Sequence, residues 1–405
     1  MPRLVIGNVP NGPEYFGQEK VLAELREALH QDHVLLAGPR RFGKTGAMYA
    51  LLDNPPDGYS PVYINVEDIT NPSDFMVELI AALASDKTFR RLFMHGQDWA
   101  TAAWSFLRSL PAEIGIGELK ITLRESQALK NQWDKQGELA LSLMSGSSPA
   151  LLLILDEFPI MIDAIAAKKP DEARQLMHWL RKSLLDKKTG TRFLIGGSIH
   201  LEPTLEALGL VDTINHLNKI EIPVFSRPVA EAFILDVFKT YAIKAHPQAP
   251  SAILNLVGAP IPYLLAVFLD AIKTEHKFGG KAEVTPEILG GLFEDSLIQG
   301  KTSATFRHYQ DRINQYYPYP LDMAAFILLE SMAQTEDGFS ENGLFQIYLK
   351  KLGLSGSYQD KQNFLILLSR LENDVYVHRE EGRCRFFSRV LRLWWLRNCC
   401  LGPEA

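Results

Sequence analysis

A short segment near the start of the chain carries the spacing of a phosphate-binding loop. The sequence GPRRFGKT at residues 38–45 fits the pattern G-x-x-x-x-G-K-[ST], whose glycines let backbone N–H groups face the phosphates of a nucleotide. Lys44 is expected to reach the β- and γ-phosphates, and Thr45 to place its hydroxyl on Mg²⁺. The expected nucleotide contacts are Gly38, Pro39, Arg40, Arg41, Phe42, Gly43, Lys44, Thr45 and Gly46.

A hydrophobic run that ends in two acids supplies further reactive groups. Residues 151–155 are all leucine or isoleucine, and Asp156 and Glu157 follow them. We expect Asp156 to hold the Mg²⁺ shell and Glu157 to orient or deprotonate an attacking water. Alone, such a run is more often a strand before a solvated turn. Downstream of a phosphate-binding loop, it favours hydrolysis of ATP with Mg²⁺ as cofactor.

Three other segments each allow a functional and a structural interpretation. Ser198 could act catalytically beside the γ-phosphate, or it could cap a helix that begins near residue 201. Phe16 and Gly17 could line an adenine pocket or simply pack. Pro262 could contact the base from a lid, or it could only mark the first turn of a helix.

Composition limits the classes of protein and partner. The chain has 405 residues with 46% hydrophobic content, which suggests two or three domains. Lys and Arg total 42 against 48 for Asp and Glu, so any nucleic-acid contact must be local. No apolar run has the length of a membrane span, and the three cysteines form no C-x-x-C pair. We therefore expect a cytoplasmic protein with no membrane partner and no cysteine-bound metal.

The positions of the apolar segments predict an α/β fold. Short apolar runs alternate with helical patterns up to residue 222, which is typical of a parallel sheet with helices on both faces. Five strands are expected, at residues 33–37, 61–67, 151–155, 192–196 and 219–222.

An insertion separates the second and third expected strands. Residues 94–148 exceed the usual length of a crossover. Within them, residues 115–123 alternate enough for a strand or hairpin, whereas residues 124–143 have a helical pattern. The sequence assigns this insertion no task.

The remainder of the chain reads as helical until a final hairpin. Helical patterns at residues 229–241, 251–256, 262–274 and 286–297 predict a lid. Three amphipathic helices at 321–333, 342–352 and 358–372, followed by a hairpin at 374–387, predict a winged helix. In the last helix, at about residues 388–398, we expect Trp394 and Trp395 to pack the domain. The expected boundaries are 1–223 for the P-loop core, 224–300 for the lid, 301–320 for a linker and 321–405 for the winged helix.

The wing of this domain carries a basic strip. The third helix is locally neutral, but the arginines around the hairpin could touch phosphates of DNA. A face that is solvated or contacts protein is the commoner explanation, so a protein partner is favoured and DNA stays open. The strip consists of Arg379, Arg383, Arg385, Arg389, Arg392 and Arg397.

Together these motifs resemble those of the prokaryotic archaeal-type ATPases, in the STAND branch of the AAA+ ATPases. The resemblance rests on Phe16-Gly17, the loop at 38–45, the LDEF sequence at 155–158, the GGS sequence at 196–198 and the GAPIPY sequence at 258–263. It covers nearly the whole chain, including the winged helix. It implies a five-stranded sheet with the phosphate loop on a central strand, ATP and Mg²⁺ binding, and nucleotide-dependent switching or assembly of copies.

Two departures from the family pattern affect the expected activity. Gln18 stands where Arg is common, and residues 198–200 lack the Arg that often follows the fourth strand. Residues 202–218 contain no arginine finger, which leaves Arg181, Arg192 and Arg227 as substitutes. Because such an Arg supplies much of the transition-state stabilisation, the sequence favours an ATPase that is slow without an activator and serves as a regulatory switch. The alternative is a DNA-binding AAA+ ATPase of the initiator or transposition-regulator type.

Overall fold

The structure is a computed structural model that describes residues 3–39, 41–95, 116–197, 201–279, 282–300, 303–317 and 319–400. Two compact units make up the chain. The first, here the N-terminal unit, is Val9–Pro223, and the second, the C-terminal unit, is Val224–Ala405 together with Met1–Asn8. None of the described helices has both the length and the apolar character of a membrane span.

A five-stranded parallel sheet forms the centre of the N-terminal unit, which confirms the expected fold class. Its order is β2-β3-β4-β1-β5. The register sets Leu36 of β1 beside Gly196 of β4, and Asn65 of β2 beside Asp156 of β3. The carboxyl ends of the strands therefore meet at one edge. The strands are β1 (His33–Ala37), β2 (Tyr59–Asn65), β3 (Ala150–Asp156), β4 (Arg192–Gly196) and β5 (Leu217–Glu221).

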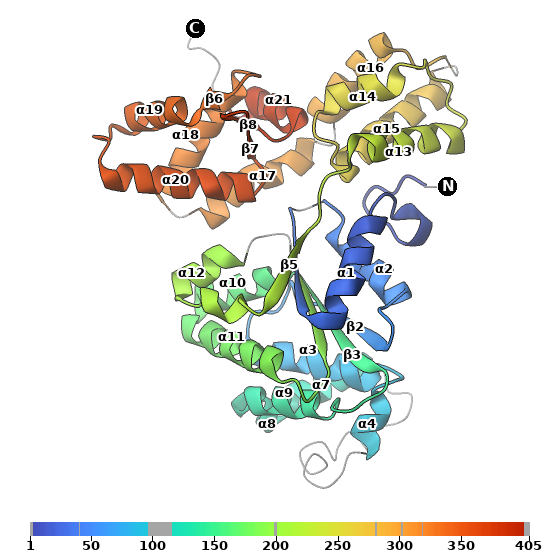
Figure 1. Ribbon diagram of the computed structural model, residues 1–405, viewed down its shortest axis with the longest axis vertical. Helices are drawn as coiled ribbons and strands as arrows, with labels where there is room; N and C mark the ends of the chain where they lie inside the picture. The colour runs from blue at the N-terminus through green and yellow to red at the C-terminus, as the bar shows by residue number, and fades with distance from the viewer. Residues whose placement is uncertain are drawn as a thin grey trace. The chain divides into compact units, whose positions relative to one another are not determined.

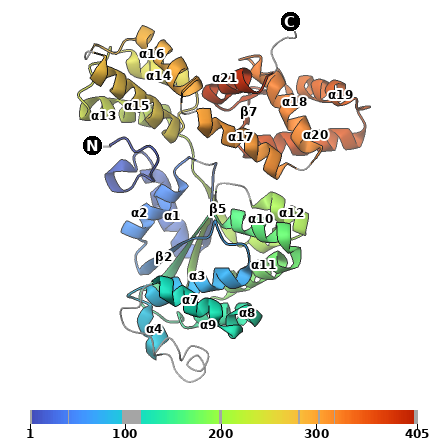
Figure 2. The same cartoon turned by 180° about the vertical axis from the view of Figure 1, so that it is seen from behind.

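Helices cover both faces of this sheet because its side chains alternate between two apolar layers. Leu151, Leu153 and Leu155 join the core that α10 (Phe158–Lys168) and α11 (Pro170–Leu185) complete. Figures 1 and 2 show α1 (Glu19–Gln31) and α2 (Lys44–Asp53) along the opposite side. Both faces of the sheet are therefore buried, as parallel sheets require. Shorter elements of this unit are η1 (Gly12–Glu14), α12 (Glu202–Leu208) and η2 (Val211–Ile214).

The described part of the insertion forms helices joined by short turns, so the strand or hairpin expected at residues 115–123 is wrong. Ile116–Glu125 forms α7. Leu119 and Leu123, four residues apart, are both buried, whereas Ile121 between them is 60% exposed. The helical period therefore prevails over the apparent alternation. The neighbouring helices are α3 (Pro72–Ser85), α4 (Arg90–His95), α8 (Gln127–Asn131) and α9 (Trp133–Ser142).

The first half of the C-terminal unit consists of helices, at the places where helical patterns occur. They are α13 (Arg227–Thr240), α14 (Ala249–Val257), α15 (Pro262–Phe278), α16 (Pro286–Phe293) and a π-helical turn η3 (Glu294–Ile298). The expected linker also contains a helix, α17 (Ser303–Tyr316). Phe306, Ile313 and Tyr317 recur at helical spacing and are all buried, so this segment packs as part of the unit.

The second half of this unit combines four helices with a small antiparallel sheet of order β6-β8-β7. Trp394 and Trp395 are 1% and 0% exposed, which confirms that they pack the core. The strand β6, only two residues long, was not expected from the sequence. The elements are α18 (Leu321–Ala333), β6 (Phe339–Ser340), α19 (Glu341–Leu352), α20 (Tyr358–Asn373), β7 (Val377–Glu380), β8 (Arg383–Phe386) and α21 (Arg389–Asn398).

Candidate functional site

The loop between β1 and α2 has the backbone conformation that its glycines permit. Gly38 has a φ of 144° and Gly43 a φ of 99°, values that a side chain disfavours. Arg41 also has a positive φ, 72°. Helix α2 begins directly after Gly43, so its first N–H groups, which lack partners within the helix, lie at the end of the loop. This is the arrangement that binds phosphate at helix N-termini.

The Lys44 side chain lies against the loop backbone. Its Nζ donates to the carbonyl oxygen of Gly38 at 2.5 Å and to that of Pro39 at 2.7 Å. Lys44 is only 5% exposed, and a buried ammonium group requires such partners. A phosphate would offer the same ammonium group a charged and therefore stronger acceptor.

The Asp156 carboxylate is the point where three elements meet. Asp156 is 1% exposed at the end of β3. Its Oδ2 accepts the hydroxyl proton of Thr45 at 2.8 Å and that of Tyr63 at 3.0 Å, and its Oδ1 accepts the backbone N–H of Glu157 at 3.0 Å. The structure thus brings Thr45 and Asp156 together, although they are 111 positions apart.

Tyr63 is a member of this site that the sequence did not indicate. It lies on β2, and only the pairing of β2 with β3 places its hydroxyl at Asp156. Burial, and then the charge of Asp156, raise the pKa of Tyr63 well above its ordinary value. The hydroxyl therefore remains protonated and can only donate to the carboxylate.

Glu157 lies in a left-handed backbone conformation at the start of α10. Its φ is 58°. A Cβ added to Gly197, just after β4, would lie 3.5 Å from Oε2 of Glu157 and would overlap the ring of Pro159. The carboxylate of Glu157 thus lies beside the end of β4, the strand between β1 and β3. The phosphate loop begins at the same edge of the sheet, directly after β1.

The oxygen atoms at this edge suit Mg²⁺. Magnesium prefers hard oxygen ligands and keeps several water molecules. The hydroxyl proton of Thr45 is donated to Asp156, which leaves the lone pairs of Thr45 Oγ1 for a cation. Among the described residues, Oδ1 of Asp156 accepts one hydrogen bond, from the N–H of Glu157, and so retains a second acceptor position. Thr45 and Asp156 can therefore hold a magnesium ion that also binds nucleotide phosphates.

The N-terminal segment packs directly onto the phosphate loop. A Cβ on Gly46 would lie 2.6 Å from the ring of Tyr15, and one on Gly43 would lie 3.2 Å from it. The hydroxyl of Tyr15 is buried without a hydrogen-bond partner among the described residues, and burial raises its pKa. Phe16 and Gly17 follow immediately and are half-buried. They directly follow Tyr15, the residue that contacts the phosphate loop. Their contact with adenine stays a prediction.

Gln18, which stands where the resembled family often has Arg, has a local role. It is 4% exposed, and its Nε2 donates to the carbonyl oxygen of Pro223 at 3.5 Å. The side chain thus joins the start of α1 to the segment after β5.

Some predicted site residues cannot be placed at the site. Arg40 and Ser198 lie outside the described residues. Phe42 is 3% exposed, so its side chain is part of the core around the loop. Pro262 begins α15 in the C-terminal unit, as expected of a proline at a helix start. Its contact with a nucleotide base stays a prediction.

The three arginines considered as finger substitutes each have partners close by. Arg181 pairs with Asp212, and Arg227 pairs with Glu231 at 3.2 Å. Arg192 donates to carbonyl oxygens at the end of α1, including that of Leu29 at 3.1 Å. These contacts give all three side chains structural roles within their own unit.

The arginines of the basic strip also make contacts within the C-terminal unit. Arg392 is 8% exposed and donates to the carbonyl oxygen of Ala333 at 3.1 Å. Arg383 donates to carbonyl oxygens at the turn before β6. The others form ion pairs: Arg379 with Glu372, Arg385 with Glu380, Arg389 with Glu336 and Arg397 with Glu294. Much of the positive charge of the strip is therefore balanced locally.

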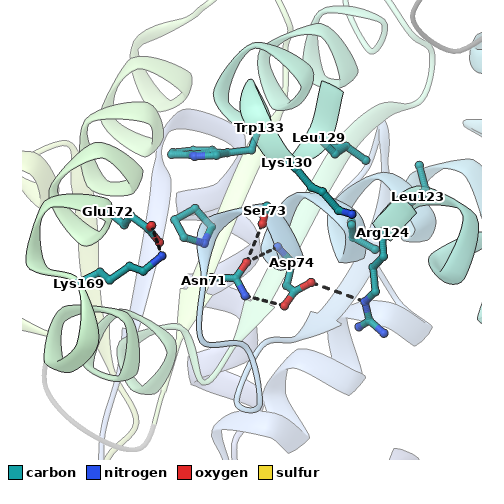
Figure 3. A pocket seen from close by; sticks show the side chains of 12 residues that line it. Asn71, Ser73, Asp74, Leu123, Arg124, Leu129, Lys130, Trp133, Lys169 and Glu172 are labelled. Carbon is teal, nitrogen blue, oxygen red and sulfur yellow. Dashed lines mark hydrogen bonds and ion pairs between the residues drawn. The ribbon is translucent and has the colours of Figure 1, made fainter. Parts of the chain in front are cut away.

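A separate pocket of about 310 Å³ lies beside the insertion, and none of its lining residues belongs to the phosphate loop. Figure 3 shows it between the first turn of α3, the insertion helices and the start of α11. Arg124 lies 3.6 Å from Asp74, and Lys169 lies 2.6 Å from Glu172, so these opposite charges largely offset each other. Trp133 forms part of the lining.

The five-stranded parallel sheet, with the phosphate loop after β1 and the two acids at the end of β3, is a fold that solved structures share. A solved structure of a Walker-type ATPase from Pyrococcus abyssi is similar to this chain with a TM-score of 0.63 at 14% identity, covering 96% of this chain and 98% of that one. The ORC2 protein of Aeropyrum pernix, in ADPNP and ADP complexes, is similar with a TM-score of 0.56 at 13% identity, covering 97% and 95%. No protein-family model and no curated protein sequence matches the chain.

Proposed function

We propose that this protein binds ATP with Mg²⁺ and hydrolyses it slowly, as a nucleotide-dependent regulatory switch. The observation that carries the proposal is the hydrogen bond of 2.8 Å between Thr45 and Asp156, with Glu157 next in the chain. It joins the phosphate loop to the acidic strand end in one site. Each half alone would be a common sequence feature, whereas together they form a nucleotide-hydrolysis site.

The residues of the site divide the work of phosphoryl transfer to water. Bound Mg²⁺ would neutralise charge on the β- and γ-phosphates. Lys44 would exchange its carbonyl partners for phosphate oxygens and stabilise the same charge. Glu157 would accept a proton from, or orient, the attacking water beside β4. Ser198 would contact the γ-phosphate, and Phe16, Gly17 and Pro262 would contact the adenosine part.

The structural neighbours support a nucleotide ligand. The Pyrococcus abyssi protein is described as a Walker-type ATPase, and the Aeropyrum pernix protein was solved with ADPNP and ADP. We infer from the motifs that this chain belongs with the archaeal-type ATPases of the STAND branch. We also propose a cytoplasmic location, which agrees with the free thiols of Cys384, Cys399 and Cys400.

The contacts of the arginines support a slow rate. Arg181, Arg192 and Arg227 each have a partner within their own unit, and each would have to leave it to act as an arginine finger. An arginine that stabilises the transition state contributes about 10³–10⁵-fold to turnover in related enzymes. We therefore propose that hydrolysis accelerates only when a partner, or another copy of the chain, supplies this group.

The order of elements in α18–α21 supports a winged helix, and two kinds of partner are compatible with it. Local pairing of the basic strip favours a protein partner. The alternative is a DNA-binding AAA+ ATPase of the initiator or transposition-regulator type, which the exposed ion pairs would allow because such pairs are weak and exchangeable. The pair of Arg397 with Glu294 is an example, because 51% of the Arg397 side chain is exposed.

Release of phosphate from ATP, with and without duplex DNA, distinguishes these functions. If the protein is a switch, phosphate release should be slow, and duplex DNA should change its rate by no more than about twofold. Lys44→Ala should release no phosphate. A rate that rises steeply with DNA would support the alternative. Absence of both turnover and nucleotide binding in the wild type would refute the proposed ATPase.

A further inference from the structure

The hydroxyl of Tyr63 contacts Asp156, although Tyr63 belongs neither to the phosphate loop nor to the acidic end of β3. It donates to Oδ2 of Asp156 at 3.0 Å, the oxygen that already accepts from Thr45 at 2.8 Å. A carboxylate offers about four acceptor positions in all. With the N–H of Glu157 on Oδ1, three of these positions are occupied in the described structure.

The occupied positions determine which part of Asp156 remains available. Both positions on Oδ2 are filled, so the free acceptor position is on Oδ1. Without the Tyr63 hydroxyl, Oδ2 would regain an acceptor position, and a cation could bind either oxygen. The hydroxyl thus leaves Oδ1 as the oxygen with a free position.

Packing holds the Tyr63 ring in place. The ring of Tyr49 meets it edge-on, with centroids 5.3 Å apart and an interplanar angle of 70°. Tyr49 lies one turn after Thr45 on α2, so the helix that carries Thr45 also positions the ring of Tyr63. On the other side, β2 is hydrogen-bonded to β3, which carries Asp156. A change in the distance between α2 and β3 would therefore alter both hydroxyl contacts.

We propose that Tyr63 is a positioning residue for the metal site, which occupies Oδ2 of Asp156 so that Oδ1 is the oxygen left for magnesium or its water. This inference rests on the proposed function, because it concerns magnesium bound with ATP. Groups that hydrogen-bond to metal ligands contribute about 10–100-fold to metal affinity in other proteins. The contribution of Tyr63 should accordingly appear only when magnesium is present.

The test compares binding of the fluorescent nucleotide mant-ATP in excess Mg²⁺ and in EDTA, using the full chain. Tyr63→Phe removes the hydroxyl, with its hydrogen bonds to the side chains of Asp156 and Tyr49, but keeps the ring against Tyr49. Tyr59→Phe, on the same strand, is the matched control, because its ring lies by His30 and no hydrogen bond of its hydroxyl is described. Magnesium titrations of mant-ATP binding then give the concentration for half-maximal effect in each variant.

We expect Tyr63→Phe to raise the half-maximal Mg²⁺ concentration by about 10-fold or more, with nucleotide affinity in EDTA unchanged. Tyr59→Phe should behave as the wild type does. An unchanged Mg²⁺ titration in Tyr63→Phe would overturn the inference and leave the proposed ATPase intact. An equal loss of affinity in EDTA would also overturn it, since the role of Tyr63 would then be structural. Absence of binding by the wild type in both buffers would instead refute the proposed function itself.

Discussion

The ring of Tyr15 lies so close to Gly46 that a Cβ at position 46 would come within 2.6 Å of it. Gly46 is in the first turn of α2, where an alanine would otherwise favour the helix. The glycine is therefore required by the approach of the N-terminal segment to the phosphate loop. This contact also explains why the segment containing Phe16 and Gly17 begins beside the loop.

Gly46→Ala should therefore destabilise the protein by about 1–3 kcal/mol, because the added methyl group forces the Tyr15 ring to move. Gly117→Ala is the matched control in the same unit, since a Cβ on Gly117 would meet nothing within 4 Å. The control should be neutral or stabilising by up to about 1 kcal/mol. Urea unfolding measures both, and equal effects of the two substitutions would contradict the close contact.

His33 should make stability depend on pH. Its Nε2 lies 2.9 Å from the carbonyl oxygen of Leu184 and its Nδ1 accepts the N–H of Phe193 at 3.1 Å, so the ring is held neutral. Burial lowers the pKa of His33 from 6.5 to about 4. Between these values the unfolded chain binds more protons, so stability is full above about pH 6.5 and falls as the pH drops toward 4.

Protonation of His33 should have a measurable effect on the free energy of unfolding. The contribution of His33 can change by at most about 1.4 kcal/mol per pH unit within that window. Unfolding of the wild type and of His33→Gln at pH 7.5 and 5.0 isolates it, because the other titrating groups are shared. The wild type should lose more stability than the variant between the two pH values. Equal losses would show that the ring is protonated in the folded state.

Arg392 should matter for stability rather than for DNA. Replacing it by Ala removes the hydrogen bond to the Ala333 carbonyl oxygen and the pairing with Glu336, at a cost of about 1.5–3 kcal/mol. Arg370→Ala, on α20, is the control, because no hydrogen bond or ion pair of the Arg370 side chain is described. Its effect on stability should be within about 0.5 kcal/mol. Thermal unfolding and a DNA mobility-shift assay are made on both variants. Loss of DNA affinity in Arg392→Ala without loss of stability would contradict this assignment.

The strands of the sheet and the two halves of the site could be predicted because their signals are local. The loop at residues 38–45 and the acids at 156 and 157 are short motifs beside apolar runs. Both Thr45 and Asp156 were expected at the same Mg²⁺. The hydrogen bond between them agrees with that expectation.

The remaining features depend on tertiary packing. Residues 115–123 alternate in the sequence, but Ile116–Glu125 forms a helix that buries Leu119 and Leu123 on one side. The contact of Tyr63 with Asp156 requires β2 to lie next to β3, and no residue of β2 predicts that pairing. Likewise, the arginines of the basic strip could not be told from free charges until their partners on distant segments were known.

Single-turnover conversion of bound ATP to ADP tests the central claim most directly. Wild type and Glu157→Gln are each loaded with a substoichiometric amount of γ-labelled ATP in the presence of Mg²⁺, and bound nucleotide is separated over time. We predict that both bind ATP, that the wild type converts it to ADP and phosphate, and that Glu157→Gln retains ATP at least about 100-fold longer, as expected for loss of the group that activates water. Conversion by Glu157→Gln at the rate of the wild type would contradict the account, because the site at the end of β3 would then not be the site of hydrolysis.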